Sequence, residues 1–600
     1  MGDVDKDGLD VLPNNKERYI SFSKRVLVDK MPCPWEQEQT RLNKLMTECL
    51  EEEKEESDVE FDDQEESGEE DNLERQDLDT DTEQEISDSE DDFSERQPTF
   101  VGKDKVTVWK KHVPNKSVKT KPSNIIKQLP GVKRIAKDLK REIDIWKYFF
   151  SKQVLNLIVH YTNQHIQSFR ANYQRERDAK DTDLIEIEAL FGLLYLAGVL
   201  KSNRLNIDEL WSQNGTGVEL FRLTMSQCRF RFLLVHIRFD NLTTRDERKQ
   251  TDKLAPIREV FELVVNNFKT AYTPFQFVTI DEKLEAFRGR CNFRQYIPSK
   301  PNKYGIKIFA MADAKTFYTS NMEVYVGTQP SGQFEASNSP TAVVQRLCEP
   351  IKGTSRNVTV DNWFTSMNLL TSLDTDFKLT LLGTIRKNKK ELPLEFSRPL
   401  GRPISSSMFA FRKNCTLVSY IPKKNKNVLL LSSMHHDDEI DSDTKKPDMI
   451  MDYNMSKGGV DCVDKLCAAY NCARNTKRWP MVIFYSLLNV AGINSFVIFS
   501  INNSSNQRRR TFLRALAFQL VEGHNRRRVT QSIPRVMQQR IRQMFGLEAP
   551  VPEPPQEGQR GRCSYCDRKK NRPTRFSCVE CHKYICLEHS LMICHPCHQE

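Results

Sequence analysis

Four aspartates lie where the residue pattern of the chain changes. The stretch 357-NVTVDNWFTSMNLL-370 places Asp361 after a short β-branched run and before an apolar helical pattern. Asp281 ends a similar run, FQFVTID (275–281), while Asp461 and Asp464 lie one helical turn apart in 455-MSKGGVDCVDKLCAAY-470. Carboxylates that converge from neighbouring strand ends repel one another unless a cation lies between them, usually a divalent metal ion. Acids on three separate elements therefore favour a two-metal site for phosphodiester chemistry.

The same acids also have an ordinary structural explanation. Aspartate is common as a helix N-cap and in turns that follow strands. Spacing alone leaves both interpretations open, so the flanking residues have to decide.

Three stretches around the acids resemble the piggyBac family of cut-and-paste DNA transposases. They are 280-IDEKLEAFRGRCNFRQYIPSKPNKYGIKI-308, 360-VDNWFTS-366 and 456-SKGGVDCVDKLCAAYNCARNTKRWPMVIFYSLLNVAGINSF-496. The resemblance extends over nearly all of the chain from around residue 130 to 600. It implies a ribonuclease H-like catalytic core in which Asp281, Asp361 and Asp461 form a catalytic triad that binds two Mg²⁺ ions. Asp464 matches a further acid beside the triad and is expected to bind metal as well.

Basic and aromatic residues accompany these motifs. Basic groups contact phosphates and planar rings stack on unpaired bases, so DNA contacts are expected from this region. The alternative is a solvated turn whose aromatic residues belong to the core. Arg386 and Lys389 match a family position near target DNA, and Trp479 is equally compatible with DNA contact and with packing. The complete set of expected DNA contacts is Arg288, Arg290, Lys300, Lys303, Tyr304, Asn362, Arg386, Lys389, Arg478 and Trp479.

The C-terminal residues 563-CSYCDRKKNRPTRFSCVECHKYICLEHSLMICHPC-597 contain four short ligand pairs. Eight Cys and His ligands in such pairs fit two tetrahedral Zn²⁺ ions, and so small a domain needs cross-links of this kind to fold. A cross-brace would assign Cys563, Cys566, Cys586 and His589 to one ion. It would assign Cys578, Cys581, Cys594 and Cys597 to the other, with His582, His595 and His598 as possible substitutes. In the family, this tail binds transposon-end DNA.

The charge distribution favours a polyanionic partner. Residues 51–92 hold 24 acidic and 2 basic residues, a net charge of −22 within a chain of +8, so the rest of the chain carries +30. A body this basic is typical of proteins that bind nucleic acid. The serines in the acidic tract make it a candidate substrate of an acidophilic kinase. The N-terminus lacks the apolar core of a secretory signal, the apolar window 481–500 is expected to be a buried helix, and a nuclear location is expected.

The residue patterns predict a chain of several units. The expected fold is an α/β ribonuclease H-like core with an inserted domain, flanked by an all-α DNA-binding and dimerisation domain. A zinc-binding cross-brace follows it and a disordered acidic region precedes it. The boundaries are a disordered region at 1–125, helical parts at 126–274 and 471–548, core parts at 275–387 and 448–470, an insertion at 388–447, a linker at 549–560 and the cysteine-rich domain at 561–600.

The resemblance implies a homodimeric transposase acting on double-stranded DNA. It would nick at terminal inverted repeats, use the freed 3′-hydroxyl to form a hairpin, and join the ends into TTAA sites. The alternative is a domesticated nuclear DNA- or chromatin-binding protein that no longer mobilises DNA. A ubiquitin ligase or histone reader built on the tail would leave the four acids without a role.

Overall fold

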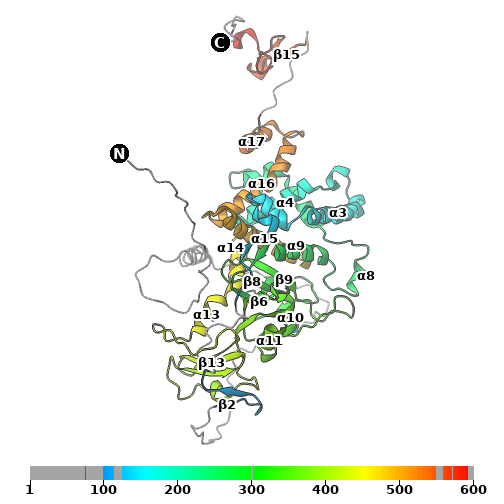
Figure 1. Cartoon of the computed structure of the whole chain (residues 1–600). Coiled ribbons are helices and arrows are strands. Elements are labelled where there is room, and N and C mark those ends of the chain that lie inside the picture. The colour runs from blue at the N-terminus through cyan, green and yellow to red at the C-terminus, as the bar shows by residue number, and fades with distance from the viewer. Residues whose placement is uncertain are drawn as a thin grey trace, which may run out of the picture. The chain divides into compact units, whose positions relative to one another are not determined.

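A mixed β-sheet runs through the described part of the chain (Figure 1). The computed structural model describes residues 74–75, 99–113, 125–298, 300, 302–548, 559–570 and 572–591. The strand order is β1-β7-β8-β6-β10-β11-β14-β13-β12-β3-β2, and β9 pairs with β8. The strands are β1 (Glu74–Arg75), β2 (Thr99–Val101), β3 (Val108–Lys110), β6 (Phe277–Ala286), β7 (Gln295–Tyr296), β8 (Tyr304–Asp313), β9 (Thr319–Val324), β10 (Asn357–Val360), β11 (Thr380–Thr384), β12 (Ser407–Arg412), β13 (Cys415–Lys423) and β14 (Lys426–Ser432).

The centre of this sheet combines antiparallel and parallel pairing. Strands β6, β8 and β9 are antiparallel neighbours, whereas β10 runs parallel to β6 and β11 runs parallel to β10. Buried apolar residues fill both faces of these strands, which is why their sequences read as nearly continuous hydrophobic runs. The mixed α/β sheet predicted from the sequence is confirmed.

The segment expected to be an insertion continues this sheet. Strand β14 pairs antiparallel with β11, and β13 and β12 follow in order. Strand β3 then pairs with β12, so that residues 99–110 form the last hairpin of the sheet. The fully buried Trp109 donates a hydrogen bond to the carbonyl of Glu391 at 2.9 Å. The expectation of disorder is therefore wrong for 99–113, because two very short strands gain their stability from a partner almost three hundred residues away.

Helices form the rest of the body. They are α2 (Glu142–Phe149), α3 (Lys152–Phe169), α4 (Leu184–Val199), α5 (Ile207–Leu210), α6 (Glu219–Thr224), α7 (Gln227–His236), α8 (Arg245–Lys249), α9 (Arg258–Ala271), α10 (Pro340–Cys348), α11 (Met367–Ser372), α12 (Leu394–Ser397), α13 (Asp448–Ser456), α14 (Gly459–Ala469), α15 (Trp479–Asn503), α16 (Arg509–Val529) and α17 (Arg535–Phe545). Helices from before and after the sheet pack together, α4 on α16 and α2 on α15. Gly192 permits the first contact, since a Cβ there would lie 2.7 Å from a Val521 methyl group.

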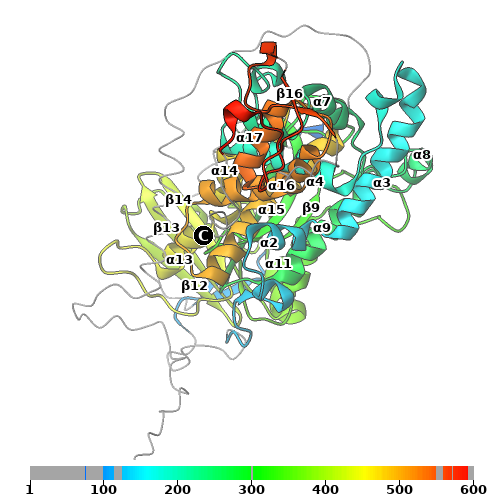
Figure 2. The same ribbon diagram turned by 90° about the horizontal axis from the view of Figure 1, so that it is seen from above.

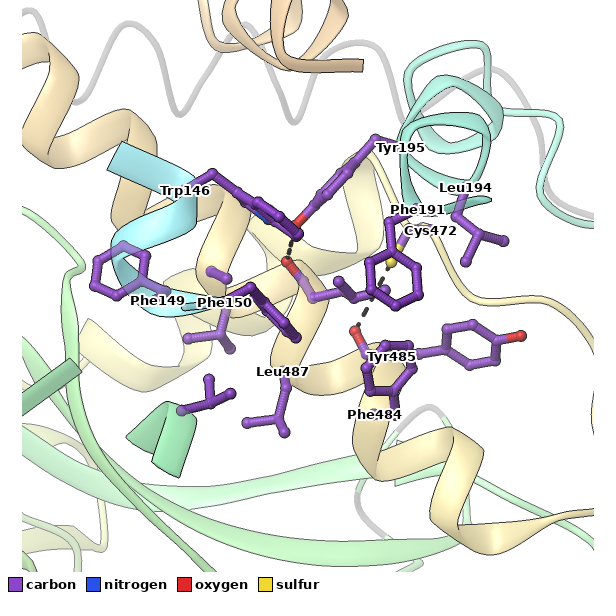
Figure 3. Packing of buried hydrophobic residues seen from close by; sticks show 14 of the residues in the cluster. Trp146, Phe149, Phe150, Phe191, Leu194, Tyr195, Cys472, Phe484, Tyr485 and Leu487 are labelled. Carbon is purple, nitrogen blue, oxygen red and sulfur yellow. Dashed lines mark hydrogen bonds between the residues drawn. The ribbon is translucent and has the colours of Figure 1, made fainter. Parts of the chain in front are cut away.

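Large aromatic residues fill the core between these helices (Figure 3). The indole of Trp146 stacks on Phe150 at 4.9 Å and donates a hydrogen bond to the hydroxyl of Tyr195 at 2.8 Å. Tyr195 donates in turn to the carbonyl of Leu488 at 2.6 Å, so every polar group of this buried chain has a partner. The two halves of the helical region, far apart in sequence, thus share one core.

Helix α15 is long and apolar enough to cross a membrane, with a mean hydropathy of 1.9 in its most apolar window. That window is 94% buried inside the protein, in agreement with the buried helix expected from the sequence. In Figures 1 and 2, α15 lies beside β9. Asn494 fixes this contact, because its side-chain amide exchanges two hydrogen bonds with the backbone of Thr319, each 2.9 Å long. A polar residue in an apolar helix here anchors the helix to the sheet.

Candidate active site

Two neighbouring strands bring Asp281 and Asp361 together. In the parallel pair, Val358 lies opposite Val278 and Thr359 opposite Thr279, so the register continues to Asp361 beside Asp281. Carboxylate oxygens of Asp281, Asp361 and Glu282 all lie within 4.8 Å of one another. The convergence expected from the sequence is thus present for two of the acids.

The two aspartates reach this position differently. Asp361 follows the last residue of β10, and one of its carboxylate oxygens accepts the backbone N–H groups of Trp363 at 3.0 Å and Phe364 at 3.4 Å. The sequence predicts that Asp281 ends its strand. This prediction is wrong, because β6 continues to Ala286 opposite β8. The acidic and basic residues that follow Asp281 hid this continuation, since they resemble a turn.

Burial is the largest electrostatic effect on these groups, and mutual repulsion is the second. Burial, followed by the negative charges of Glu282 and Asp361, raises the pKa of Asp281 well above its usual value. Burial and Glu282 likewise raise the pKa of Asp361 to about 6, against the opposing effect of the two N–H donors and Arg386. Carboxylate oxygens are ligands that Mg²⁺ prefers, and a cation would relieve this repulsion. The donor set therefore fits a divalent metal ion.

Glu282 is the member of this group that the sequence pattern did not predict. Its side chain is buried beside the two aspartates. Successive residues of a strand normally point to opposite faces, which is why the neighbour of Asp281 was not expected in the same group. The run 281-DEKLE-285, with three acids in a strand, was the available signal.

Asp461 lies in the first turn of α14, and its side chain is 56% exposed. The ammonium group of Lys300 lies 3.7 Å from its carboxylate and donates a 3.2 Å hydrogen bond to the carbonyl of Glu282. Burial acts to lower the pKa of Lys300, but Asp281, Glu282 and Asp461 outweigh it and raise the pKa. Lys300 thus lies between Asp461 and the buried acids, and within the described residues Asp461 is not part of the group that spans 4.8 Å.

Close contacts hold the end of α13 and the start of α14 against the sheet. The hydroxyl of Thr279 donates to the carbonyl of Ser456, and Thr359 and Ser456 share a 2.7 Å hydroxyl contact. A Cβ on Gly459 would lie 2.4 Å from the Thr279 hydroxyl oxygen, so only glycine fits there. Gly459 therefore lets the helix approach β6.

Asp464, expected as a metal ligand, forms a 2.8 Å ion pair with the buried Lys283. Burial raises the pKa of Asp464, and the charge of Lys283 opposes this effect. Within the described residues it also falls outside the group of Asp281, Glu282 and Asp361.

Half of the ten residues expected to contact DNA are exposed, and the others are partly buried. The ring of Tyr304 is 38% exposed, lies 4.8 Å from that of Tyr296, and has the Arg294 guanidinium 5.9 Å from its centre. Arg386 and Lys389 line a shallow surface pocket together with Asn388, Lys390 and Glu391. Arg288, Arg290, Lys303 and Asn362 are exposed, and Lys300 is partly buried.

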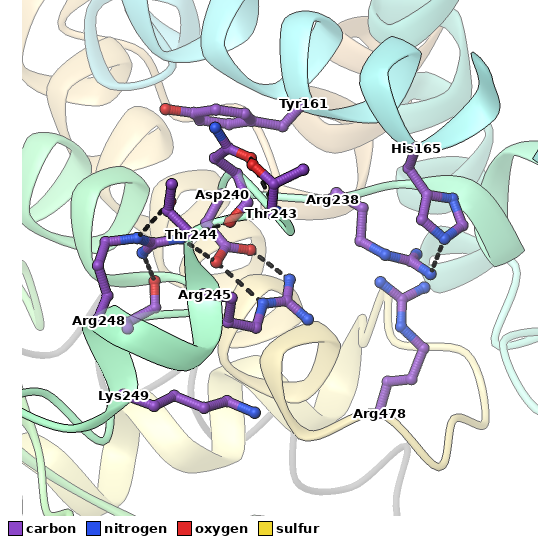
Figure 4. Close-up of polar contacts among 12 residues, drawn as sticks. Tyr161, His165, Arg238, Asp240, Thr243, Thr244, Arg245, Arg248, Lys249 and Arg478 are labelled. Atoms are coloured by element: carbon purple, nitrogen blue, oxygen red, sulfur yellow. Dashed lines mark hydrogen bonds and ion pairs between the residues drawn. The ribbon is translucent and has the colours of Figure 1, made fainter. Parts of the chain in front are cut away.

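Arg478 and Trp479 make packing contacts instead. The guanidinium of Arg478 donates to the backbone carbonyls of Leu234, Val235 and Ile237 at the end of α7. Figure 4 shows it close to Arg238, and burial lowers the pKa of Arg478 to about 10. Trp479 packs edge to face on Phe293 at 4.9 Å. These contacts favour structural roles for both residues.

Four residues of the tail come together as a compact ligand set. Nδ1 of His589 lies 3.7 Å from the sulfur of Cys563, 3.6 Å from that of Cys566 and 3.2 Å from that of Cys586. The sulfurs of Cys566 and Cys586 are 3.6 Å apart. Separations of this size are those of thiolate and imidazole ligands around one tetrahedral Zn²⁺ ion, so this donor set fits zinc. Cys578 and Cys581 are partly buried, whereas Cys594, Cys597, His595 and His598 lie outside the described residues.

Comparisons with known proteins give a family model and several relatives that match this chain. A family model described as Transposase IS4 matches residues 141–496. Two proteins of Homo sapiens, PiggyBac transposable element-derived protein 3 and Chimeric ERCC6-PGBD3 protein, are each 22% identical to this chain over 386 residues. These matches cover 58% of this chain but 60% and 34% of the relatives, so the chain spans less than two thirds of their length.

A solved structure gives a more extensive match. The cryo-EM structure of a piggyBac transposase synaptic complex with hairpin DNA is 36% identical in sequence, with a TM-score of 0.66. The match covers 78% of this chain and 100% of that one.

Proposed function

Because the chain belongs to the transposase IS4 family, and within it to the piggyBac transposases, we propose that it is a metal-dependent DNA transposase. It would excise a DNA segment and insert it at TTAA sites by phosphodiester cleavage and strand transfer. The observation that carries this proposal is the buried group of Asp281, Glu282 and Asp361 within the matched fold.

Four acidic residues and one lysine would carry out the functions of the site. Asp281 and Asp361, with Asp461 from α14, would hold two Mg²⁺ ions, and Glu282 adds a carboxylate that the sequence did not suggest. Bound divalent cations supply activation of the attacking hydroxyl and charge stabilisation of the leaving oxygen. Lys300 would offer a positive charge to the phosphate that enters between the acids, because it lies between Asp461 and the backbone of Glu282.

The surroundings of the acids suit a DNA strand. Arg288, Arg290 and Lys303 are exposed beyond the end of β6 and the start of β8, where they would contact phosphates. The exposed ring of Tyr304 would stack on an unpaired base, and Asn362, next to Asp361, would contact the strand at the reaction site. Arg386 and Lys389 would contact target DNA.

The partners and location follow from the same proposal. Two ends must be processed together, so the protein would act as a homodimer on paired ends inside the nucleus. Light scattering of the DNA complex tests this, because one chain for each pair of ends would contradict it. Two Zn²⁺ ions in the tail would support recognition of the ends.

The names of the human relatives suggest a second candidate, a transposon-derived DNA-binding protein without mobilising activity. The two candidates differ in one measurement, the nicking of supercoiled plasmid DNA by the purified full chain in Mg²⁺ or Mn²⁺. Nicking that is lost in Asp281→Ala supports the transposase, whereas DNA binding without any nicking supports the derived binding protein.

A further inference from the structure

A lysine buried beside the acids has two carboxylate partners from different elements. Lys283 lies on β6, two residues after Asp281, and its side chain is 3% exposed. Its ammonium group is 2.7 Å from Glu285 on the same strand and 2.8 Å from Asp464 on α14. Glu285 also accepts a 2.6 Å hydrogen bond from Ser486 of α15. The contact therefore joins three elements.

One ammonium group faces two carboxylates in this cluster. Burial alone would lower the pKa of Lys283, but Asp464, Cys467 and Glu285 outweigh it and raise the pKa well above its usual value. The two carboxylates at 2.7 Å and 2.8 Å give Lys283 the pairing that a buried charge needs. Lys283 neutralises carboxylate charge in the interior, and Glu285 and Asp464 neutralise the charge of Lys283.

The position of Asp464 in α14 connects this cluster to the active site. Asp464 is one turn after Asp461, so both residues lie on neighbouring parts of one helix face. Asp281 lies on β6, the strand that holds Asp464 through Lys283. Fixing Asp464 against β6 therefore fixes the distance between Asp461 and Asp281. A metal ion at Asp464 would have to share the carboxylate with Lys283, which already lies 2.8 Å from one of its oxygens.

We infer that Lys283 is a positioning residue, which ties α14 to β6 through Asp464 and so sets Asp461 relative to Asp281. Asp464 serves as the anion of this clamp and does not bind metal. The inference rests on the proposed function for its effect on cleavage, but its effects on stability and metal binding do not depend on it.

A double-mutant cycle in the full chain tests the clamp. The variants are Lys283→Met, Asp464→Asn and the two together, with Lys352→Met as a matched control. Lys352 forms a 3.9 Å ion pair with Glu349 at an exposed place, where a lost pair has little effect. Three quantities are measured: the Tm without metal, the Kd for Mn²⁺ by calorimetry, and the rate of plasmid nicking in Mn²⁺.

The clamp predicts a characteristic set of results. Lys283→Met leaves two neighbouring carboxylates without a cation, so the Tm falls and nicking drops by about tenfold or more. Asp464→Asn still offers Lys283 an oxygen, so its Kd for Mn²⁺ stays within about threefold of the starting protein and its nicking falls less than that of Lys283→Met. The double variant regains part of the Tm and of the nicking lost in Lys283→Met, because one unpaired charge is gone.

Two results would overturn the clamp. One is a loss of Mn²⁺ affinity in Asp464→Asn as large as that in Asp281→Asn, which would make Asp464 a ligand. The other is a double variant no better than Lys283→Met in either Tm or nicking. If Lys283→Met does not fold, the Mn²⁺ comparison between Asp464→Asn and Asp281→Asn decides alone. A starting protein that binds Mn²⁺ but never nicks DNA would contradict the proposed function and leave the stability cycle to judge the clamp.

Discussion

Asp281 and Asp361 are held in a place that disfavours their own ionised forms. Their raised pKa values arise from burial and from like charges nearby, and the three-dimensional register of β6 and β10 enforces both. When no cation is bound, the repulsion between such groups reduces the stability of the protein. When a cation is bound, the same groups can take part in chemistry. The side chains proposed to hold the metal ions are therefore among those that stabilise the fold least.

The first prediction follows from that conflict. Asp281→Asn and Asp361→Asn should each abolish plasmid nicking, and should leave the Tm of the metal-free protein equal or higher, because a neutral amide removes the repulsion. Differential scanning fluorimetry and the nicking assay measure the two effects. Asp246→Asn, whose side chain is 98% exposed, is the control and should change neither quantity. Nicking at the original rate by Asp281→Asn would remove it from the active site.

A buried pair of histidines leads to a second prediction at this scale. Arg238 can only donate, so Nε2 of His165 accepts, and its Nδ1 proton is donated to Nδ1 of His236. His236 then carries its own proton on Nε2, which faces the hydroxyl of Tyr173 at 3.0 Å. Both rings are thus neutral. Burial, with the positive charge of Arg238, lowers the pKa of His165 to about 3 and that of His236 to about 4.

The contribution of the neutral histidine pair to the free energy of unfolding should be complete above pH 6.5 and be lost as the pH falls. Below pH 6.5 the unfolded chain binds protons that the folded protein does not. Between pH 7.5 and pH 5.5 the free energy of unfolding should fall by about 1.4 kcal/mol for each histidine. The Tm across this range measures the effect. His165→Asn should flatten the dependence and His160→Asn, at an exposed position, should not. Equal slopes in both variants would exclude the buried pair as the cause.

At the scale of elements, the site depends on how closely α14 approaches the sheet. Gly458 and Gly459 precede Asp461, but only the second is crowded: a Cβ at Gly459 meets the Thr279 hydroxyl at 2.4 Å, whereas one at Gly458 meets nothing closer than a sulfur at 3.8 Å. A side chain is thus excluded at Gly459 by lack of space, but not at Gly458. They offer a matched pair of substitutions.

Gly459→Ala should push α14 away from β6 and displace Asp461. Plasmid nicking should fall by about tenfold, and the free energy of unfolding by about 1–3 kcal/mol, as for an overpacked core. Gly458→Ala should have little effect on either quantity. Nicking kinetics and urea unfolding of the two variants give the comparison, and an equal loss in both would show that the close approach is not the cause.

The central strands of the sheet, the helical regions on both sides and the buried character of α15 could be predicted from the sequence, because each rests on a local pattern of several residues. The pairing of β3 with β12 could not, since three-residue strands carry no periodicity and the partner lies far along the chain. Glu282 and Lys283 escaped notice for a related reason. Their roles depend on which elements face β6, and no local spacing contains that information.

At the scale of the whole molecule, charge is divided between segments. The tract 51–92 carries −22 and the rest of the chain +30, and a tethered tract competes with DNA at high local concentration. Apart from the backbone of residues 74–75, this tract lies outside the described residues, so its action stays a prediction from sequence.

Deletion of residues 1–95 should tighten binding to duplex DNA, most at low salt, where charges are screened least. Phosphorylation of the full chain by an acidophilic kinase should have the opposite effect, since it adds negative charge to the tract. Fluorescence anisotropy over a range of salt concentrations measures both. An unchanged affinity after the deletion, at low salt, would contradict the competition.

The tail gives the last prediction. Thiolates must be deprotonated and gathered by the metal, so chelation should unfold residues 561–600 while the helical and catalytic regions stay folded. Native mass spectrometry of the intact protein should find two zinc ions. A chain truncated at Pro555 should bind transposon-end duplex more weakly, yet nick plasmid at the original rate. A different zinc count would refute the ligand scheme, and unchanged end affinity would refute the recognition role.

The location of Asp281 in the middle of a long strand also has a consequence for how the protein opens over time. Strand β6 pairs with β8 from Val278 to Ala286, and with β10 from Phe277 to Thr279, just before Asp281. Backbone amides in such a strand exchange with deuterium only when the surrounding sheet comes apart, whereas those near helix ends and in loops exchange through small local openings. The amides around Asp281 should therefore be among the slowest of the body, and those of residues 386–391 much faster. The acids proposed to cut DNA would then belong to the part of the molecule that opens last, and the basic loop proposed to contact target DNA to a part that opens early.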